Sequence, residues 1–262
     1  MGHEKKKQFG QHFLKNAGDA QRVADALQGW GDSYNQLLEI GPGEGRLTDF
    51  LVERVSAHQQ LELIEVDDDL INLLNDKYGA RGVRVHHGDV LKYPFGETDQ
   101  CGVIGNFPYN ISSQIVFAIL ENRHLVQEMV GMFQKEVAQR IVADSGTKVY
   151  GILSVLTDAY YKRQPIFTLK PGAFHPPPKV NSMVIRLERY RYEIPDIDNN
   201  LFFRVVKQAF GQRRKTLRNS LKVYLNENSI NALGETILQR RAEQLNHQEF
   251  SLITKVIQEH WQ

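Results

Sequence analysis

The chain has 262 residues, a formal net charge of +1, 41% hydrophobic residues and a single cysteine. This length and hydrophobic content predict one α/β domain with a small additional domain, and a lone cysteine excludes a disulfide within the chain. No apolar run approaches the roughly 20 residues of a membrane span, and the N-terminus lacks the apolar core of a signal peptide. We therefore expect a cytoplasmic protein with no membrane partner.

The first strong pattern is a strand, a glycine-rich turn and a helix. An apolar run at residues 37–40 leads into Gly41-Pro-Gly43-Glu-Gly45, and apolar residues at helical spacing follow. These glycines let the backbone approach a ligand closely. A dinucleotide-binding fingerprint requires glycine at position 46, where this chain has arginine. The spacing is more typical of a nucleoside ligand without a pyrophosphate, bound at Gly41 and Gly43.

The next two predicted strands also end in acids. The strand at residues 61–67 ends in acids about 20 residues beyond the loop, where a carboxylate can accept hydrogen bonds from both ribose hydroxyls, and we assign this role to Glu65. Residues 67–69 are aspartates that we expect to start the following helix. A third strand, at residues 83–87, leads to Asp89, which is either an acceptor for an adenine amino group or an ordinary turn aspartate.

A fourth strand, at residues 101–105, delivers Asn106-Phe107-Pro108-Tyr109. The exocyclic amine of a nucleobase is a poor nucleophile because its lone pair is delocalised, and acceptors placed along its N–H bonds favour the tetrahedral form that attacks a methyl group. The Asn106 side chain and a main-chain carbonyl of Phe107 or Pro108 can provide two such acceptors, and Tyr109 can stack on the base. The same residues could form only a turn. The meeting of four strand ends at one edge of a parallel sheet favours the ligand site.

The second half begins with helices and strands and ends with helices alone. Helices are predicted at 111–122, 135–143 and 150–161, and strands at 129–133 and 180–187. Phe174 precedes three prolines, which act either as a rigid connector or as a support that holds Phe174 against the base face opposite Tyr109. After a linker at residues 190–195 only short helical patterns remain, which predicts domains at residues 1–190 and 191–262.

The cysteine and the histidines argue against two other chemistries, methylation at a pyrimidine carbon and metal binding. Methylation at carbon 5 of a pyrimidine needs a thiolate, but Cys101 opens an apolar strand without a basic neighbour and is predicted to be a core residue. The nine histidines show no ligand spacing, so we expect no metal site.

Positive charge is unevenly distributed. Residues 199–226 contain seven lysines or arginines and no acids. We expect Arg213, Arg214, Lys215 and Arg218 to bind RNA phosphates, although a charge run can also be a solvated face. A second basic stretch, at residues 5–7, leads into the sequence FGQHFL.

The chain resembles the ribosomal RNA adenine N6-dimethyltransferase family, most closely its bacterial small-subunit branch. The resemblance rests on seven motifs in order: FGQHFL, EIGPGEG, LIEVD, GDVL, GNFPYNIS, FHPPPKVNS and AFGQRRKTLRNSL. It implies an α/β fold with a Rossmann-like class I methyltransferase sheet of seven strands, the last antiparallel, and a small all-α C-terminal domain. It also implies S-adenosyl-L-methionine as methyl donor, contacted by His12, Leu14, Gly41, Glu65, Asp89 and Asn106, and a target-base pocket formed by residues 106–109 with Phe174. Relatives often have asparagine at position 12 and leucine at position 107.

The implied reaction is transfer of methyl groups to N6 of two adjacent adenosines near the 3′ end of small-subunit (16S) ribosomal RNA, during ribosome biogenesis. The expected partner is this RNA or the assembling small subunit, and the expected state is a monomer. Antibiotic-resistance methyltransferases of large-subunit rRNA share most of the motifs, but GQRRKTLRNSL resembles the small-subunit enzymes. A non-catalytic ribosome-assembly factor is a further alternative, against which the intact NFPY sequence and Glu65 count.

Overall fold

The computed structural model describes residues 12–56, 58–95, 100–191 and 197–260. The basic stretch at residues 5–7 and the first three residues of FGQHFL lie outside these ranges. The chain forms two compact units, one of Met1–Ala138 with Arg163–Arg189 and the other of Gln139–Lys162 with Tyr190–Gln262. No helix among the described residues is long and apolar enough to cross a membrane.

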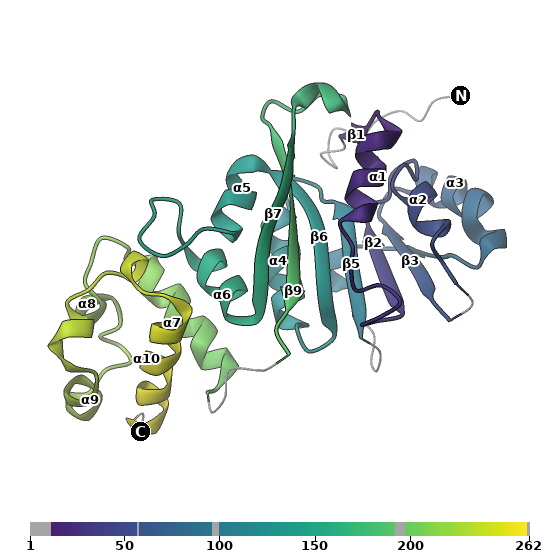
Figure 1. Ribbon diagram of the computed structural model, residues 1–262. Coiled ribbons are helices and arrows are strands. Elements are labelled where there is room, and N and C mark those ends of the chain that lie inside the picture. The colour runs from purple at the N-terminus through teal and green to yellow at the C-terminus, as the bar shows by residue number, and fades with distance from the viewer. Residues whose placement is uncertain (1–11, 57, 96–99, 192–196, 261–262) are drawn as a thin grey trace. The chain divides into compact units, whose positions relative to one another are not determined.

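The first unit is built on a seven-stranded sheet in the order β4-β3-β2-β5-β6-β9-β7 (Figure 1). The pairs from β4 to β6 are parallel, and β9 runs antiparallel to β6. This arrangement confirms the seven-stranded sheet with an antiparallel last strand. The strands are β2 (Gln36–Ile40), β3 (Gln60–Glu65), β4 (Arg84–His87), β5 (Cys101–Asn106), β6 (Val126–Gln134), β7 (Tyr161–Leu169) and β9 (Ser182–Arg189).

Strands that are buried on both faces can be recognised in the sequence as apolar runs, whereas a part-exposed edge strand cannot. The interior strands β2, β3, β5 and β6 are buried on both faces and read as almost continuous apolar runs. At one edge, β7 has mostly polar or part-exposed positions and contains Pro165, which an edge strand tolerates because it needs no donor on its outer side. For this reason β7 has no recognisable strand pattern, and the helix expected at 150–161 ends before it, as α6 (Ile152–Tyr160).

The strand order reverses between β2 and β5. From β2 the chain continues to β3 on one side, and from β5 it continues to β6 on the other. Open α/β sheets bind ligands at the carboxyl ends of strands on either side of such a reversal. The loop after β2 contains Gly41–Gly45, and Asn106 at the end of β5 leads into the loop that contains Phe107, Pro108 and Tyr109.

Helices connect these strands, and the helix after β3 begins at the aspartates that were expected to start it. Asp67 is the N-cap of α3 and accepts a hydrogen bond from the Asp69 N–H at 3.2 Å. In Figure 1, α4 lies behind the strands of the sheet. The helices are α1 (Ala17–Asp25), α2 (Thr48–Val52), α3 (Asp68–Tyr78), α4 (Ser112–Glu121) and α5 (Lys135–Ile141), and a two-stranded sheet pairs β1 (Phe13–Leu14) with β8 (Phe174–His175).

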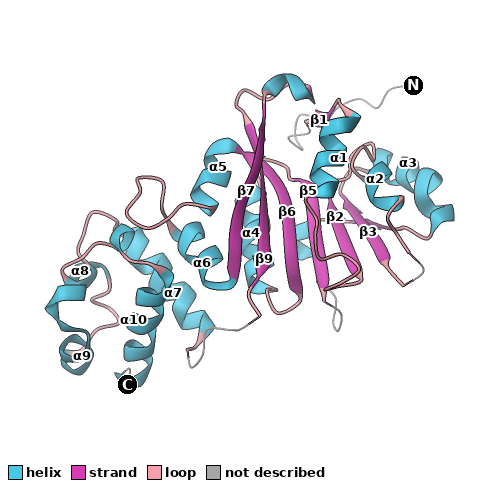
Figure 2. Cartoon of the chain, in the orientation of Figure 1, coloured by secondary structure: helices cyan, strands magenta, loops and turns pink. Residues whose placement is uncertain are grey.

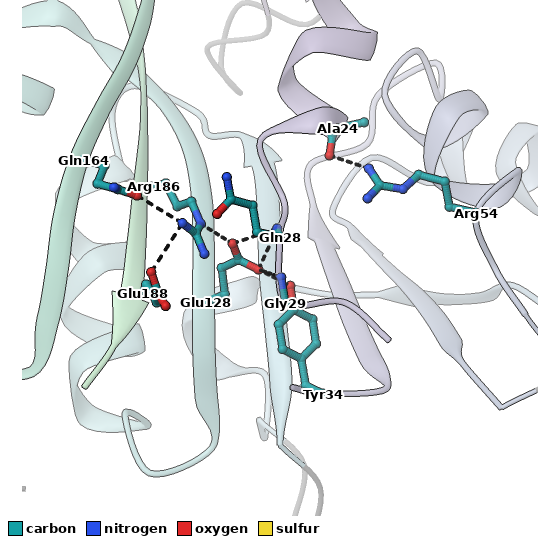
Figure 3. A network of polar contacts seen from close by, with 9 residues as sticks. All are labelled: Ala24, Gln28, Gly29, Tyr34, Arg54, Glu128, Gln164, Arg186 and Glu188. Carbon is teal, nitrogen blue, oxygen red and sulfur yellow. Dashed lines mark hydrogen bonds and ion pairs between the residues drawn. The ribbon is translucent and has the colours of Figure 1, made fainter. Parts of the chain in front are cut away.

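A buried ion pair connects β6 and β9 to the segment after α1 (Figure 3). The Glu128 carboxylate on β6 pairs with the Arg186 guanidinium on β9 and accepts hydrogen bonds from the Gly29 N–H at 2.8 Å and the Tyr34 hydroxyl at 2.6 Å. A buried charge is tolerated only when it is paired and hydrogen-bonded. The network therefore fixes these segments near the start of β6, whereas the loops after β2 and β5 lie at the opposite strand ends.

The second unit is helical (Figure 2). Beside α6 it contains α7 (Asn199–Gly211), α8 (Leu217–Ser220), α9 (Glu227–Leu238) and α10 (His247–His260). The Tyr160 hydroxyl donates to the Asn199 side chain at 2.6 Å, and His247 lies 2.9 Å from the Asp158 carboxylate. These contacts join α6 to α7 and α10, so residues 139–162 group with the C-terminal helices in addition to the residues after 190.

Candidate active site

A cavity of about 210 Å³ lies at the carboxyl ends of the parallel strands. Four strand ends contribute to its lining, because consecutive parallel strands all direct their following loops to this edge. Residues from the N-terminal segment close it further. The lining comprises His12, Phe13, Ile40, Gly41, Gly43, Ile64, Glu65, Val66, Gly88, Asp89, Val90 and residues 106–111.

The glycine loop after β2 has left-handed backbone conformations that a side chain would disturb. Gly43 has φ of 59°, and a Cβ atom at this position would collide with the ring of Phe13. Gly41 has φ of 66°, and its N–H donates to the Ile64 carbonyl at 3.0 Å. Glycine therefore permits both the turn and the close approach of the N-terminal segment to this loop.

The Glu65 carboxylate is held by main-chain donors. One oxygen, Oε1, accepts from the N–H groups of Val66 and Asp67 at 2.9 and 3.1 Å, and Oε2 accepts from the Gly43 N–H at 3.2 Å. Burial raises the pKa of this carboxyl, and the three N–H groups oppose that rise because they stabilise the charged form. A carboxylate has about four acceptor positions. Three are occupied by the described main chain, which leaves Oε2 able to accept from a ligand hydroxyl in the cavity.

The sequence left open whether Asp89 is a ligand acceptor or an ordinary turn aspartate, and the structure gives it features of both. It lines the cavity, and its Oδ1 caps the short 3₁₀ helix at Val90–Lys92 by accepting from the Leu91 N–H at 2.9 Å. The cap fixes the carboxylate at the cavity wall, so the turn aspartate and the possible ligand acceptor are the same residue.

The Asn106 amide has a defined orientation. Its Nδ2 donates to the main-chain carbonyl of His12 at 2.6 Å. A carbonyl oxygen can only accept, so the nitrogen of the amide must be the atom that faces His12. The side-chain carbonyl oxygen of Asn106 therefore points away from the His12 carbonyl and can accept from a ligand.

The residues after Asn106 form a supported turn. The Phe107 ring is buried and packs edge-on against Phe133, with ring centroids 5.1 Å apart. The Pro108 carbonyl accepts from the Ile111 N–H at 3.1 Å, so the turn itself already uses this oxygen. Tyr109 is half-buried in the cavity wall, and burial raises the pKa of its hydroxyl.

Two residues expected at the site do not line the cavity. Leu14 and Phe174 are directly opposite each other in the β1–β8 pair, and both are buried in the hydrophobic core, Phe174 with no exposed surface. Successive side chains on a strand point to opposite faces, so an inward Phe174 follows from the pairing with Leu14. In this conformation Phe174 packs in the core and presents no ring face to a base in the cavity.

The four basic residues expected to bind RNA all belong to the second unit. Arg214 and Lys215 are exposed. Arg213 donates to the Lys148 carbonyl at 2.9 Å and lies 3.8 Å from the Glu243 carboxylate, and Arg218 pairs with Glu235. The acid-free stretch of sequence thus acquires two acidic neighbours in space, Glu243 and Glu235.

The structure also bears on two chemistries that the sequence argues against, attack by a cysteine thiolate and metal binding. Cys101 is buried, and burial raises the pKa of its thiol to about 12, which disfavours a thiolate. In the described part of the chain, no group of three or more His, Cys, Asp or Glu residues is arranged to hold a metal ion.

Sequence reasoning missed Phe13, Ser182 and Pro176 as neighbours of the site. Ser182 contacts Tyr109, and Pro176 contacts His12. Their only signal in the sequence was membership of FGQHFL and FHPPPKVNS, since local periodicity carries no information on which distant segments meet.

Residues 2–259 match the family model described as Ribosomal RNA adenine dimethylase. The Ribosomal RNA small subunit methyltransferase A of Cytophaga hutchinsonii is 44% identical over 254 residues, covering 96% of each chain. The protein of the same name from Flavobacterium johnsoniae is 46% identical over 258 residues, covering 97% of this chain and 95% of the relative.

Solved structures show the same fold. A dimethyladenosine transferase from Plasmodium falciparum has a TM-score of 0.77 at 23% identity, covering 92% of this chain and 96% of the other. The 23S rRNA methyltransferase ErmE has a TM-score of 0.68, also at 23% identity, covering 92% of this chain and 99% of the other. At this identity the similarity concerns the fold alone, and it confirms the Rossmann-like class I methyltransferase architecture.

Proposed function

Because the chain belongs to the ribosomal RNA adenine dimethylase family, we propose that the cavity holds S-adenosyl-L-methionine beside one target adenosine of small-subunit ribosomal RNA. The protein is a S-adenosylmethionine-dependent rRNA adenine dimethyltransferase. We place the reaction at N6 of two adjacent adenosines near the 3′ end of that RNA.

The residues present fit a nucleoside donor. Oε2 of the Glu65 carboxylate keeps one acceptor position for a ribose hydroxyl, and Asp89 is fixed by its cap in the cavity wall, where it can accept from an adenine amino group. Gly43 has no side chain, so its main chain lines the cavity directly. We assign donor binding to these residues with Gly41, His12 and Asn106, while Leu14 contributes from the core side through β1.

When bound, S-adenosylmethionine supplies an electrophilic methyl group on a sulfonium that leaves as a neutral thioether. The task of the protein is to orient the amine. The Asn106 side-chain oxygen accepts one N–H of the target amine, and the Phe107 carbonyl is the preferred second acceptor because the Pro108 carbonyl is already used by Ile111. These acceptors favour the tetrahedral nitrogen and stabilise the charge that develops on it. Tyr109 stacks on the base.

The observation that carries this proposal is the fixed orientation of the Asn106 amide within the cavity that Glu65 and Asp89 also line. No strong general base is needed, because the amine proton can pass to water after methyl transfer. Phe174 would act on the base only if its ring left the core, so we assign it a supporting role in this conformation.

The partner is small-subunit rRNA, free or within an assembling subunit, and we propose that the exposed Arg214 and Lys215 of the second unit bind its phosphates. We propose that the protein acts as a monomer. We place the reaction in the cytoplasm, where bacterial ribosomal subunits assemble.

The test is mass analysis of ribosomal RNA after incubation with the protein and labelled donor. Small-subunit and large-subunit RNA that lack the modification are supplied separately. We expect dimethylated adenosine in the small-subunit RNA. Methylation of large-subunit RNA instead would favour the antibiotic-resistance reaction, and no methylation of either would favour an assembly factor.

A further inference from the structure

The hydroxyl of Tyr109 is bound by a residue outside the cavity. It lies 2.5 Å from Oγ of Ser182, the first residue of β9. Ser182 has no exposed surface and does not line the cavity, so it cannot itself touch a substrate there. The two residues are 73 positions apart in the sequence.

The Tyr109 ring has a second support on the side of His12. The two ring centroids are 5.3 Å apart with the planes inclined by 33°. The Nδ1 atom of His12 lies 2.7 Å from the Pro176 carbonyl, and because that oxygen only accepts, Nδ1 carries the proton and donates. Both supports of Tyr109 therefore lead to one segment, residues 176–182, directly through Ser182 and indirectly through His12.

We propose that Ser182 is a positioning residue for methyl transfer, which holds the Tyr109 ring at the angle required to stack on the target adenine. This inference rests on the proposed function. A half-buried tyrosine whose hydroxyl is free can turn about its side-chain bonds, and a stacking surface that turns binds the base in many orientations. Tethering the hydroxyl leaves one orientation, so the amine is presented to Asn106 in the reactive geometry more often.

A bland alternative is that Ser182 only satisfies the buried hydroxyl of Tyr109 and contributes to stability. The two cases differ in what the hydrogen bond does to the reaction. A structural role lowers the melting temperature and leaves the rate of the folded enzyme unchanged, whereas a positioning role lowers the rate at saturating donor and RNA.

The experiment is a double-mutant cycle with Ser182→Ala and Tyr109→Phe, both of which keep the size of the side chain nearly constant. Single-turnover methylation of unmethylated small-subunit RNA is measured at saturating donor. We expect each variant to lose about 5- to 50-fold in rate, and the double variant to be no slower than the slower single variant, because both remove the same hydrogen bond. Donor affinity, measured by calorimetry, should stay within about twofold of wild type.

Ser154→Ala is the matched control, since Ser154 is equally buried and hydrogen-bonded to the Arg140 carbonyl but belongs to the second unit. It should keep the wild-type rate. A wild-type rate in Ser182→Ala, or rate losses in the two variants that multiply in the double variant, would overturn the positioning role. Failure of the proposed function looks different, because the wild-type protein itself would then not methylate the RNA.

Discussion

The side-chain nitrogen of Asn106, at the end of β5, donates to the main-chain carbonyl of His12 at 2.6 Å. This contact joins the loop assigned to the chemical step to the segment that precedes β1, 94 residues away. Because His12 can only accept through that oxygen, the contact decides which end of the Asn106 amide faces the cavity. The orientation of the Asn106 amide is thus set by the main chain of another segment.

Replacement of Asn106 tests this orientation. Asn106→Ala removes the acceptor and should lower the single-turnover rate by about 10² to 10³. Asn106→Asp keeps the shape but places a carboxylate oxygen opposite the His12 carbonyl, so the side chain must turn away and the rate should fall similarly. Rapid-quench measurements with calorimetric donor titrations separate rate from binding. A wild-type rate in either variant contradicts the assigned role.

Glu65→Ala should weaken donor binding. The variant loses one hydrogen bond between the donor and a charged acceptor, worth about 1.5 to 3 kcal/mol, which corresponds to roughly 10- to 150-fold in affinity. Glu62→Gln is a suitable control, because Glu62 lies on the same strand and is buried but does not line the cavity. Calorimetry should show the loss for Glu65 alone, and equal affinity in both variants would remove Glu65 from the donor site.

Glu39 predicts a pH dependence of stability. Burial raises the pKa of its carboxyl from 4.5 to about 8, with partial opposition from the Thr48 hydroxyl, which donates to it at 2.7 Å. Between these pH values the folded state binds one proton more than the unfolded state, so this group makes the free energy of unfolding fall as pH rises, by at most about 1.4 kcal/mol per pH unit. Glu39→Gln should remove that slope.

Urea denaturation of wild type and Glu39→Gln at several pH values measures the effect. The variant should gain stability relative to wild type from pH 4.5 to 8, with no further gain above that range, since glutamine is neutral throughout and can still accept from Thr48. Parallel pH profiles for the two proteins would show that Glu39 titrates at its ordinary pKa.

Replacing basic residues of the second unit should show which of them contribute to RNA affinity and which to the stability of the fold. Arg214→Ala with Lys215→Ala removes two exposed charges and should reduce the slope of log affinity against log salt by up to about 1.4 to 1.8, without changing donor affinity. Arg213→Ala serves as the contrast, because Arg213 donates to the Lys148 carbonyl and its loss should lower the melting temperature. Filter binding at several salt concentrations and a melting curve test both. An unchanged slope in the double variant would leave Arg214 and Lys215 as solvated surface.

The sequence by itself determined the parts of this protein that depend on local pattern. Apolar runs identify the buried strands. The residues at the ends of the parallel strands or just after them meet at one edge because these strands share their carboxyl ends; they are Gly41, Glu65, Asp89 and Asn106. The capping role of Asp67 was equally predictable, since it depends only on the next few residues.

Only the tertiary structure decided which distant segments meet. The pairing of β1 with β8 turns Phe174 into the core, and contacts spanning 73 to 164 residues bring Ser182 to Tyr109, His12 to Asn106 and Pro176 to His12. The physical reason is that periodicity records burial along one element, whereas register and side-chain partners depend on how separate elements pack. The same reason hid edge strand β7, whose exposed positions leave no apolar run in the sequence.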